Sequence, residues 1–171
     1  MGGQSSRPLN VLVVGLDNSG KSTIVNRMKT TQTTGEIPPT PGFQVEKFKK
    51  GHVDFTMFDM SGAGKYRNLW EFYYRNCQAV IFVADSSDKI RMCVAKNELD
   101  TMLTSQDLKP VPLLVFANKM DLPGALNYIQ VSEALGLSAI TDRPWNIIAS
   151  NALEGSGLDE GVDWISTRTI N

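Results

Sequence analysis

A glycine-bordered loop near the start of the chain, Gly15-Leu16-Asp17-Asn18-Ser19-Gly20-Lys21-Ser22, restricts the possible folds more than any other feature. It follows the apolar run Val11-Leu12-Val13-Val14 and precedes a helical pattern at residues 21–29, so it should join a buried strand to a helix. At this spacing the glycines let backbone amides approach phosphate oxygens, Lys21 supplies a positive charge, and Ser22 offers a hydroxyl to Mg²⁺. A chance glycine turn before a capped helix is the alternative. We predict a phosphate site formed by Gly15, Asp17, Asn18, Ser19, Gly20, Lys21, Ser22 and Thr23.

A second motif, Asn118-Lys119-Met120-Asp121, follows the apolar run Leu113-Leu114-Val115-Phe116-Ala117. Ligands of open α/β sheets gather at the carboxyl ends of strands, so this motif and the phosphate loop should share one edge. The carboxylate of Asp121 can accept two hydrogen bonds from guanine, whereas adenine has no such donor pair on that edge. Asn118 can brace the loop, and the stem of Lys119 can lie along the base. We predict binding of GTP and GDP; the motif alone would also suit a polar loop that ends a strand.

Ala149-Ser150 ends a third strand-like run, Trp145-Asn146-Ile147-Ile148. Its backbone amides are candidates for a contact with the guanine carbonyl oxygen. An ordinary turn is an equal alternative at this position.

Composition limits the other functions. The chain has 171 residues, is 42% hydrophobic and carries a net charge of −1, which suits one domain and gives no basic footprint for nucleic acid. Cys77 and Cys93 have no zinc-like spacing and fit a reducing, cytoplasmic compartment. His52 is the only histidine, which excludes a metal site built from histidine.

The order of elements predicts an α/β fold. Apolar runs at 11–14, 79–83 and 113–117 are typical of parallel strands, and helical patterns lie at 21–29, 90–104, 129–135 and 158–169. Two alternating stretches within 43–59 flank a short turn and predict a hairpin, which adds one antiparallel strand to a mostly parallel sheet. We expect a short N-terminal extension at 1–9 and a single GTP-binding domain at 10–171.

Two stretches between the nucleotide motifs are expected to respond to the nucleotide. Thr40, between two prolines, offers a hydroxyl for Mg²⁺ and an amide for the γ-phosphate; a proline-flanked turn is the alternative. Asp59 follows the second hairpin strand and fits an acidic group that holds a magnesium-bound water, and the Gly62 amide fits a γ-phosphate donor. Both stretches would lose a partner on hydrolysis, which is the logic of a nucleotide switch.

Several motifs resemble the Arf/Arl (ADP-ribosylation-factor-like) branch of small GTPases. They are Pro39-Thr40-Pro41-Gly42-Phe43, Phe58-Asp59-Met60-Ser61-Gly62, Tyr66-Arg67-Asn68-Leu69-Trp70-Glu71, Asp85-Ser86-Ser87-Asp88 and Ala117-Asn118-Lys119-Met120-Asp121-Leu122. The resemblance spans most of residues 10–166 and implies the P-loop small-GTPase fold, a six-stranded, mostly parallel sheet with one antiparallel strand and helices on both faces. It also implies GTP hydrolysis, a monomer, and partners that include an effector, an exchange factor and a GTPase-activating protein.

Several further short segments resemble a ciliary member of this family that recruits the BBSome coat. They are Ser61, Arg91-Met92, Ala95-Lys96-Asn97-Glu98-Leu99-Asp100 and Glu160-Gly161-Val162-Asp163-Trp164. This resemblance implies intracellular transport at the base of a cilium. The family mechanism implies an apolar effector patch, exposed in the GTP state and centred on Phe43, Phe58 and Tyr73. Ordinary core packing is the alternative for these three aromatic residues.

The chain departs from the family pattern at three places. Ala63 stands where the family usually has a glutamine that orients the attacking water, so intrinsic hydrolysis should be very slow and no catalytic residue is assigned. Asn151 stands where a lysine commonly follows. The N-terminus is expected to be short, because Gln4-Ser5-Ser6-Arg7-Pro8 has no apolar face where the family usually has an amphipathic helix. Met1-Gly2 with Ser6 matches the myristoylation pattern at Gly2, which would give reversible membrane attachment; a shortened N-terminus with an unmodified start is the alternative.

Two other functions remain open at this stage. A GTP-binding scaffold without useful hydrolysis would share every nucleotide motif, and Ala63 favours it. A P-loop kinase or ATPase would need an arginine-rich lid and a substrate pocket, neither of which is evident, and Asp121 argues against ATP.

Overall fold

The structure is a computed structural model, and it describes residues 7–28, 43–50, 52–61 and 64–169. Six strands form one sheet in the order β2-β3-β1-β4-β5-β6. Only the β2–β3 pair is antiparallel; the other four pairs run parallel. The predicted six-stranded mixed sheet is therefore confirmed.

The elements follow one another in a largely alternating order of strands and helices. They are β1 (Arg7–Gly15), α1 (Lys21–Met28), β2 (Phe43–Lys50), β3 (Val53–Met60), the helical turns η1 (Gly64–Asn76), β4 (Ala79–Asp85), α2 (Met92–Leu103), β5 (Leu113–Asn118), α3 (Tyr128–Leu135), the single turn η2 (Leu137–Ala139), β6 (Trp145–Ala149) and α4 (Leu158–Arg168).

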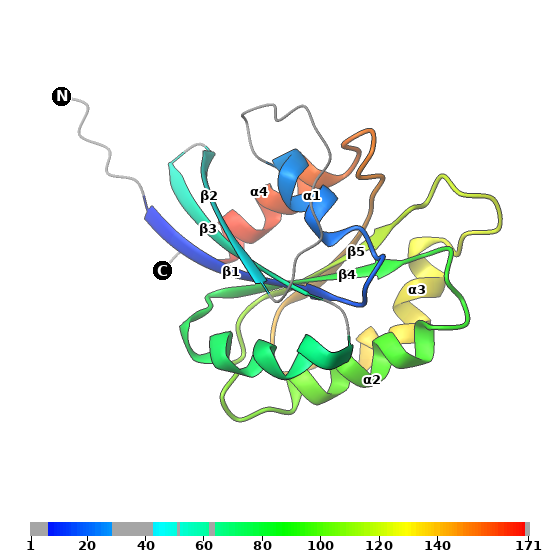
Figure 1. The fold of residues 1–171 in the computed structure, drawn as a ribbon, viewed down its shortest axis with the longest axis horizontal. Coiled ribbons are helices and arrows are strands. Elements are labelled where there is room, and N and C mark those ends of the chain that lie inside the picture. The colour runs from blue at the N-terminus through cyan, green and yellow to red at the C-terminus, as the bar shows by residue number, and fades with distance from the viewer. Residues whose placement is uncertain (1–6, 29–42, 51, 62–63, 170–171) are drawn as a thin grey trace.

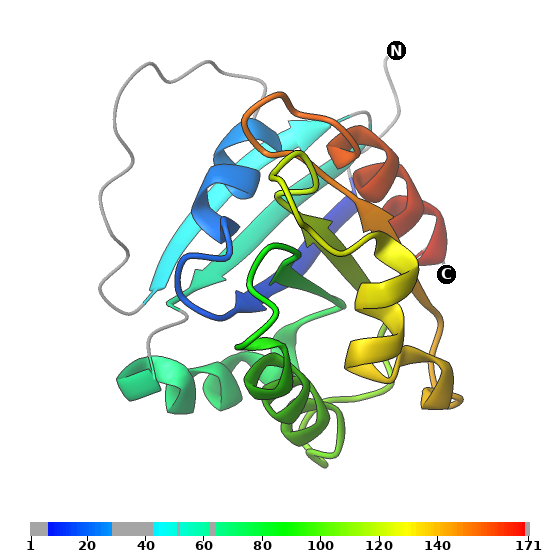
Figure 2. The ribbon, with the colours of Figure 1, turned by 90° about the vertical axis from the view of Figure 1, so that its right-hand side faces the viewer.

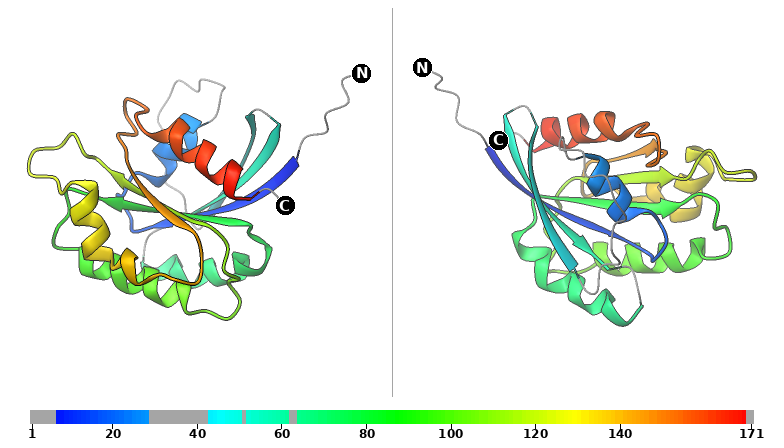
Figure 3. Two further views of the ribbon diagram at one scale, coloured as in Figure 1. Left: turned by 180° about the vertical axis from the view of Figure 1, so that it is seen from behind. Right: turned by 45° about the horizontal axis from the view of Figure 1, so that its top comes forward.

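Side chains alternate along the strands and so supply a core to each face of the sheet. Leu12 and Val14 of β1 pack with residues of η1, α2 and α3, whereas Val11 and Val13 pack with residues of α1 and α4. Figures 1 and 3 show the same division, with α1 and α4 on one side of the sheet and η1, α2 and α3 on the other. Both faces are covered, and for that reason the central strands are continuous apolar runs.

The parallel arrangement brings the carboxyl ends of β1, β3, β4, β5 and β6 to one edge. Figure 2 views the sheet from this edge, where the loop before α1 lies beside the turns that follow β4 and β5. Segments far apart in the sequence therefore meet here, as expected for a ligand site of an open α/β sheet.

The predicted helices agree with α1, α2, α3 and α4 to within two residues at each end. The helical turns of η1 were not predicted, although Leu69, Trp70, Tyr73 and Tyr74 recur at the spacing of a helix, because the stretch was interpreted only as a family motif. Within the described ranges, no helix combines the length and the apolar character needed to cross a bilayer.

Candidate functional site

The phosphate loop depends on backbone angles that most residues avoid. Gly15 has φ 153°, and a Cβ there would lie 2.4 Å from the Val83 carbonyl oxygen. Gly20 has φ 99°, and a Cβ there would lie 2.3 Å from Nδ2 of Asn118. Both glycines are therefore required by conformation and by close approach. Asn18 also lies in the left-handed region, with φ 64°.

Four consecutive carbonyl groups of this loop each accept a hydrogen bond from a side chain. Nζ of Lys21 donates to Leu16 at 3.2 Å, Nη1 of Arg91 to Asp17 at 3.2 Å, Nζ of Lys119 to Asn18 at 2.5 Å, and Nδ2 of Asn118 to Ser19 at 2.9 Å. Fixing the carbonyls fixes the peptide planes, and with them the directions of the amides that an anion would use.

Asn118, at the end of β5, is a buried hub. Its Nδ2 donates to the phosphate loop, while its Oδ1 accepts from the Ser150 hydroxyl at 3.1 Å and from the Ala152 amide at 3.2 Å. The expectation that Asn118 braces the loop is met. Because one amide group joins the phosphate end to the turn after β6, the two ends of the site are held at a fixed separation.

Lys119 adopts φ 62°, an uncommon angle for a residue with a side chain, and spans the site in the same way. Its Nζ contacts Asn18 and also pairs with Oδ2 of Asp85 at 3.0 Å. Partial burial of Asp85 acts to raise its pKa, but hydrogen bonds from Ser87 and the contact with Lys119 outweigh that effect and lower the pKa below its usual value. Asp85 therefore stays ionised and holds Lys119 in place.

A cavity of about 220 Å³ opens between the two predicted motifs. Its lining residues are Gly20, Thr23, Asn118, Lys119, Asp121, Leu122, Asn151, Ala152 and Leu153. The exposed Asp121 thus faces the same space as the start of α1, and two exposed leucines border it. A carboxylate beside apolar walls is suited to a planar ring that carries hydrogen-bond donors.

Ser22 and Asp59 form the third part of the site. The Ser22 hydroxyl donates to Oδ2 of Asp59 at 2.6 Å, and Oδ1 of Asp59 is buried without a hydrogen-bond partner among the described residues. Burial raises the pKa of Asp59, although the Ser22 hydrogen bond and the charge of Lys21 act against it. An unsatisfied buried carboxylate oxygen beside a hydroxyl fits a hard cation such as Mg²⁺.

No group of three His, Cys, Asp or Glu side chains that could hold a metal occurs in the part of the chain that the structure describes. A cation at Ser22 and Asp59 would need further ligands besides these two side chains, and phosphate oxygens and water are ligands that Mg²⁺ usually keeps in nucleotide sites.

The turn after β6 differs in detail from the prediction. The Ser150 amide donates to the Ala117 carbonyl at 2.9 Å, and the Ser150 carbonyl accepts from Met120 at 3.4 Å. This amide is already engaged, so the structure places Ala149-Ser150 next to the base cavity without presenting the Ser150 amide to it. Asn151 lines the cavity and closes its own turn through Leu153.

Two of the three predicted effector residues meet. The rings of Phe58 on β3 and Tyr73 on η1 lie 5.3 Å apart at 32°, and both are partly exposed while packing on the core. Phe43 pairs with Met60 through the backbone; its side chain lies outside the described residues. Thr40, Gly62, Ala63 and Gly2 also lie outside them.

Sequence reasoning missed two residues of the site, Asp85 and Arg91. Both residues entered the sequence analysis only within segments that resemble the family. A carboxylate after a strand and an arginine before a helix are also ordinary surface features. Their roles arise from contacts with Lys119 and Asp17, which are far away in the sequence.

The sequence matches one family of known proteins over nearly its whole length. The model of the ADP-ribosylation factor family matches residues 2–169. The chain is 56% identical over 166 residues to ADP-ribosylation factor-like protein 6 of Danio rerio, covering 95% of this chain and 89% of that protein. The protein of the same name from Caenorhabditis briggsae is 43% identical over 168 residues, covering 96% and 88%.

A solved structure gives the same result in three dimensions. The Arl6 BBS3 small GTPase from Trypanosoma brucei, with the bound nucleotide analogue GppNp, aligns with a TM-score of 0.89 and 47% identity. The alignment covers 95% of this chain and 99% of that chain.

Proposed function

The chain belongs to the ADP-ribosylation factor family of small GTPases, and from this premise we propose that it is a GTP/GDP switch whose nucleotide lies between the phosphate loop and Asp121. The observation that carries the proposal is that Gly20 and Thr23 line one cavity together with Lys119 and Asp121. A charged tail and a guanine ring would then be held by the two ends of the same space.

Each residue has a distinct proposed task. Lys21 places positive charge beside the phosphates, Asp121 accepts from the guanine edge, and Asn118 and Lys119 keep the two ends in register. Ser22 and Thr40, with Asp59 acting through a water, would hold Mg²⁺, and the ion would offset the negative charge of the phosphates. The Gly62 amide is proposed to contact the γ-phosphate.

The metal site is connected to the proposed partner surface through short contacts. The buried indole of Trp70 on η1 donates to the Ser61 carbonyl at 3.1 Å, two residues after Asp59. Phe58, next to Asp59, touches Tyr73 on the same helical turns. Loss of the γ-phosphate could therefore change the position of η1 through these contacts. This supports a switch in which the GTP state recruits an effector.

We further propose that the effector is a trafficking coat at the base of a cilium, the BBSome, and that the protein attaches reversibly to membrane through a myristoyl group on Gly2. The proposal follows the resemblance of residues 10–166 and the motif at the N-terminus. An exchange factor and a GTPase-activating protein would set the nucleotide state. Ala63 lacks the group that orients water, so intrinsic hydrolysis is proposed to be very slow.

Nucleotide titration tests the central proposal. With Mg²⁺ present, GTP and GDP should bind much more tightly than ATP and ADP, and equal affinity for adenine nucleotides would contradict it.

Partner capture tests the switch: protein loaded with a non-hydrolysable GTP analogue should retain the coat, and GDP-loaded protein should not. Equal capture in both states would favour the scaffold. Intact mass of protein from its native cell tests Gly2, and an unmodified mass would refute lipidation.

A further inference from the structure

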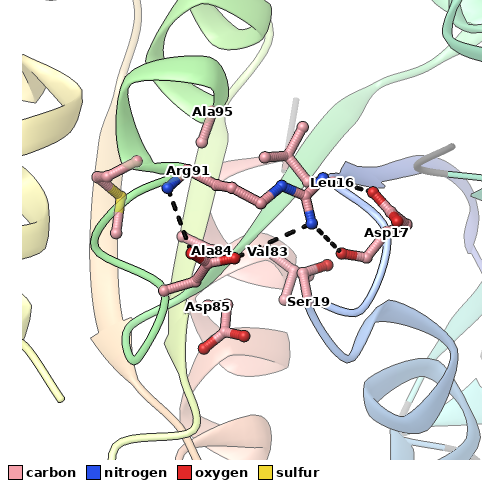
Figure 4. A pocket seen from close by; sticks show the side chains of 10 residues that line it. Leu16, Asp17, Ser19, Val83, Ala84, Asp85, Arg91 and Ala95 are labelled. Atoms are coloured by element: carbon pink, nitrogen blue, oxygen red, sulfur yellow. Dashed lines mark hydrogen bonds and ion pairs between the residues drawn. The ribbon is translucent and has the colours of Figure 1, made fainter. Parts of the chain in front are cut away.

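One arginine outside the nucleotide motifs reaches the phosphate loop. Arg91 stands immediately before α2 and extends toward Leu16 and Asp17 of the phosphate loop, as Figure 4 shows. Its Nη1 donates to the Asp17 carbonyl at 3.2 Å, and its Nη2 donates to Oδ1 of Asp17 at 2.5 Å. A guanidinium that binds the backbone and the carboxylate of one residue fixes both the peptide plane and the side chain.

Asp88, in the turn between β4 and α2, holds Arg91 in place. Its amide donates to Oδ1 of Asp88 at 3.2 Å, Nη1 lies 3.9 Å from Oδ2 of Asp88, and the Asp88 amide donates to the Asp85 carbonyl at 3.1 Å. The turn between β4 and α2 therefore holds the phosphate loop by two routes, through Arg91 to Asp17 and through Asp85 and Lys119 to Asn18. The Arg91 side chain is about two-thirds covered, at 32% exposure.

The carboxylate of Asp17 is unfavourable to an anionic ligand of this loop. Asp17 lies in the middle of a loop whose amides, together with Lys21, are arranged for polyanion binding. A carboxylate within a few ångströms of phosphate raises the free energy of the bound state by like-charge repulsion, and the repulsion grows with the charge of the ligand. The guanidinium of Arg91 offsets this charge and turns the carboxylate toward α2.

We propose that Arg91 is a positioning residue that retains nucleotide by holding Asp17, and that it slows release of the triphosphate more than release of the diphosphate. The inference rests on the proposed function of the loop. It assigns no contact between Arg91 and the nucleotide; Arg91 acts through Asp17. The effect on release is larger for GTP than for GDP because GTP carries more negative charge and is repelled more strongly by Asp17.

Release of fluorescent GTP-analogue and GDP from the full chain, measured with Mg²⁺ at low and high salt, tests the proposal. Arg91→Ala should speed release of the GTP analogue by about three- to tenfold, as expected for a partly exposed charge-assisted contact, and release of GDP by less. Arg91→Lys should release the nucleotides at rates between those of Arg91→Ala and the unmodified chain, because lysine keeps the positive charge but loses the two parallel donors of the guanidinium. High salt should narrow the difference.

The double variant separates charge from simple loss of structure. If Arg91 acts by offsetting Asp17, then adding Asp17→Asn to Arg91→Ala should bring the ratio of GTP to GDP release rates back toward that of the unmodified chain. Arg75→Ala is the matched control, because Arg75 also pairs with an aspartate, Asp107, but far from the loop. It should change neither rate.

Two results would overturn the proposal. One is unchanged release in both Arg91 variants. The other is an equal acceleration for both nucleotides that Asp17→Asn does not relieve, which would mean a purely structural contact. If the unmodified chain itself shows no preference for guanine nucleotides, the proposed function fails instead, so the two failures are distinguishable. Should Arg91→Ala not fold, the Arg91→Lys series carries the same comparison.

Discussion

The hydroxyl of Ser22, in the first turn of α1, donates a 2.6 Å hydrogen bond to Asp59 near the end of β3. This contact joins the phosphate loop to the strand that precedes η1, and it leaves the other oxygen of Asp59 buried without a partner among the described residues. The pair therefore suits the proposed cation, because a metal ion or its bound water would supply the partner that this oxygen lacks among the described residues.

Removal of Mg²⁺ should consequently speed nucleotide release from the unmodified chain. Asp59→Asn should release nucleotide faster with Mg²⁺ present and should respond much less to a chelator, since the amide holds the metal or its water more weakly. Stopped-flow release with and without EDTA measures both effects. Asp54→Asn is the control, because Asp54 lies on the same strand but is half-exposed and pairs with Lys49. A chelator effect in Asp59→Asn as large as in the unmodified chain would contradict this role.

Asp121→Asn should change the preferred base. The amide of asparagine offers one donor and one acceptor where the carboxylate offers two acceptors, so it no longer matches the two donors of guanine and instead suits xanthine, which has a carbonyl at C2. We expect affinity for GTP to fall by about tenfold or more and affinity for XTP to rise, because a buried polar group left unpaired costs about 1–3 kcal/mol. Competition titrations measure both, with Asp100→Asn on the exposed face of α2 as control. Unaltered GTP preference would place the base elsewhere.

Ala63→Gln should accelerate intrinsic GTP hydrolysis. A methyl group cannot orient water, whereas a glutamine amide can, and positioning of this kind typically contributes about a hundredfold or more. Single-turnover hydrolysis of bound GTP measures the change, and GTP affinity should stay the same. Hydrolysis by the unmodified chain at the rate of the glutamine variant would show that another group orients the water.

The sequence was sufficient for the parts of the site that depend on neighbouring residues. The loop between Gly15 and Gly20 follows β1 directly, and its backbone angles require glycine wherever that loop occurs. The apolar runs identified β1, β4 and β5 because strands buried on both faces have no polar alternation. Parallel pairing then brought their ends to one edge.

The remaining features depend on contacts between distant residues. Asn118 is ninety-nine positions from Ser19, and Arg91 is seventy-four from Asp17. No local pattern indicates which carbonyl a long side chain will reach, so Arg91 resembled surface charge. Ser150 shows the opposite case: its place was predicted, but the bond from its amide to Ala117 depends on the register of β6 against β5.

The two cysteines should differ sharply in reactivity. Burial raises the pKa of Cys77 from 9.0 to about 11, whereas Cys93 is exposed. Near pH 8, alkylation should label Cys93 rapidly and Cys77 only after unfolding, because the thiolate is the reactive form. The same shift predicts that the folding stability supplied by the neutral Cys77 thiol is present below pH 9.0 and is lost as pH rises toward about 11. Mass spectrometry after timed alkylation checks the first expectation, and rapid labelling of Cys77 in the folded chain would contradict it.

Gly161→Ala should destabilise the fold even though alanine favours helices. A Cβ at Gly161 in α4 would lie 2.5 Å from Cζ of Phe116 and 2.9 Å from Cδ2 of Leu114, both fully buried in β5. The gain in helix propensity is about 1 kcal/mol, while overpacking of a filled core costs about 1–3 kcal/mol, and these side chains have little room to move. We therefore expect a net loss of up to about 2 kcal/mol in the free energy of unfolding, measured by denaturant titration.

A matched pair of variants makes this last prediction specific. Adding Phe116→Leu, which removes the ring atoms nearest to Gly161, should make Gly161→Ala less costly than it is in the unmodified chain, because the clash is relieved. Asp163→Ala, at an exposed position of the same helix, should leave stability within about 0.5 kcal/mol. Because β5 ends at Asn118, a shift of α4 against this strand should also weaken guanine-nucleotide binding. A more stable Gly161→Ala protein with unchanged binding would show that α4 does not press on β5 as closely as the structure has it.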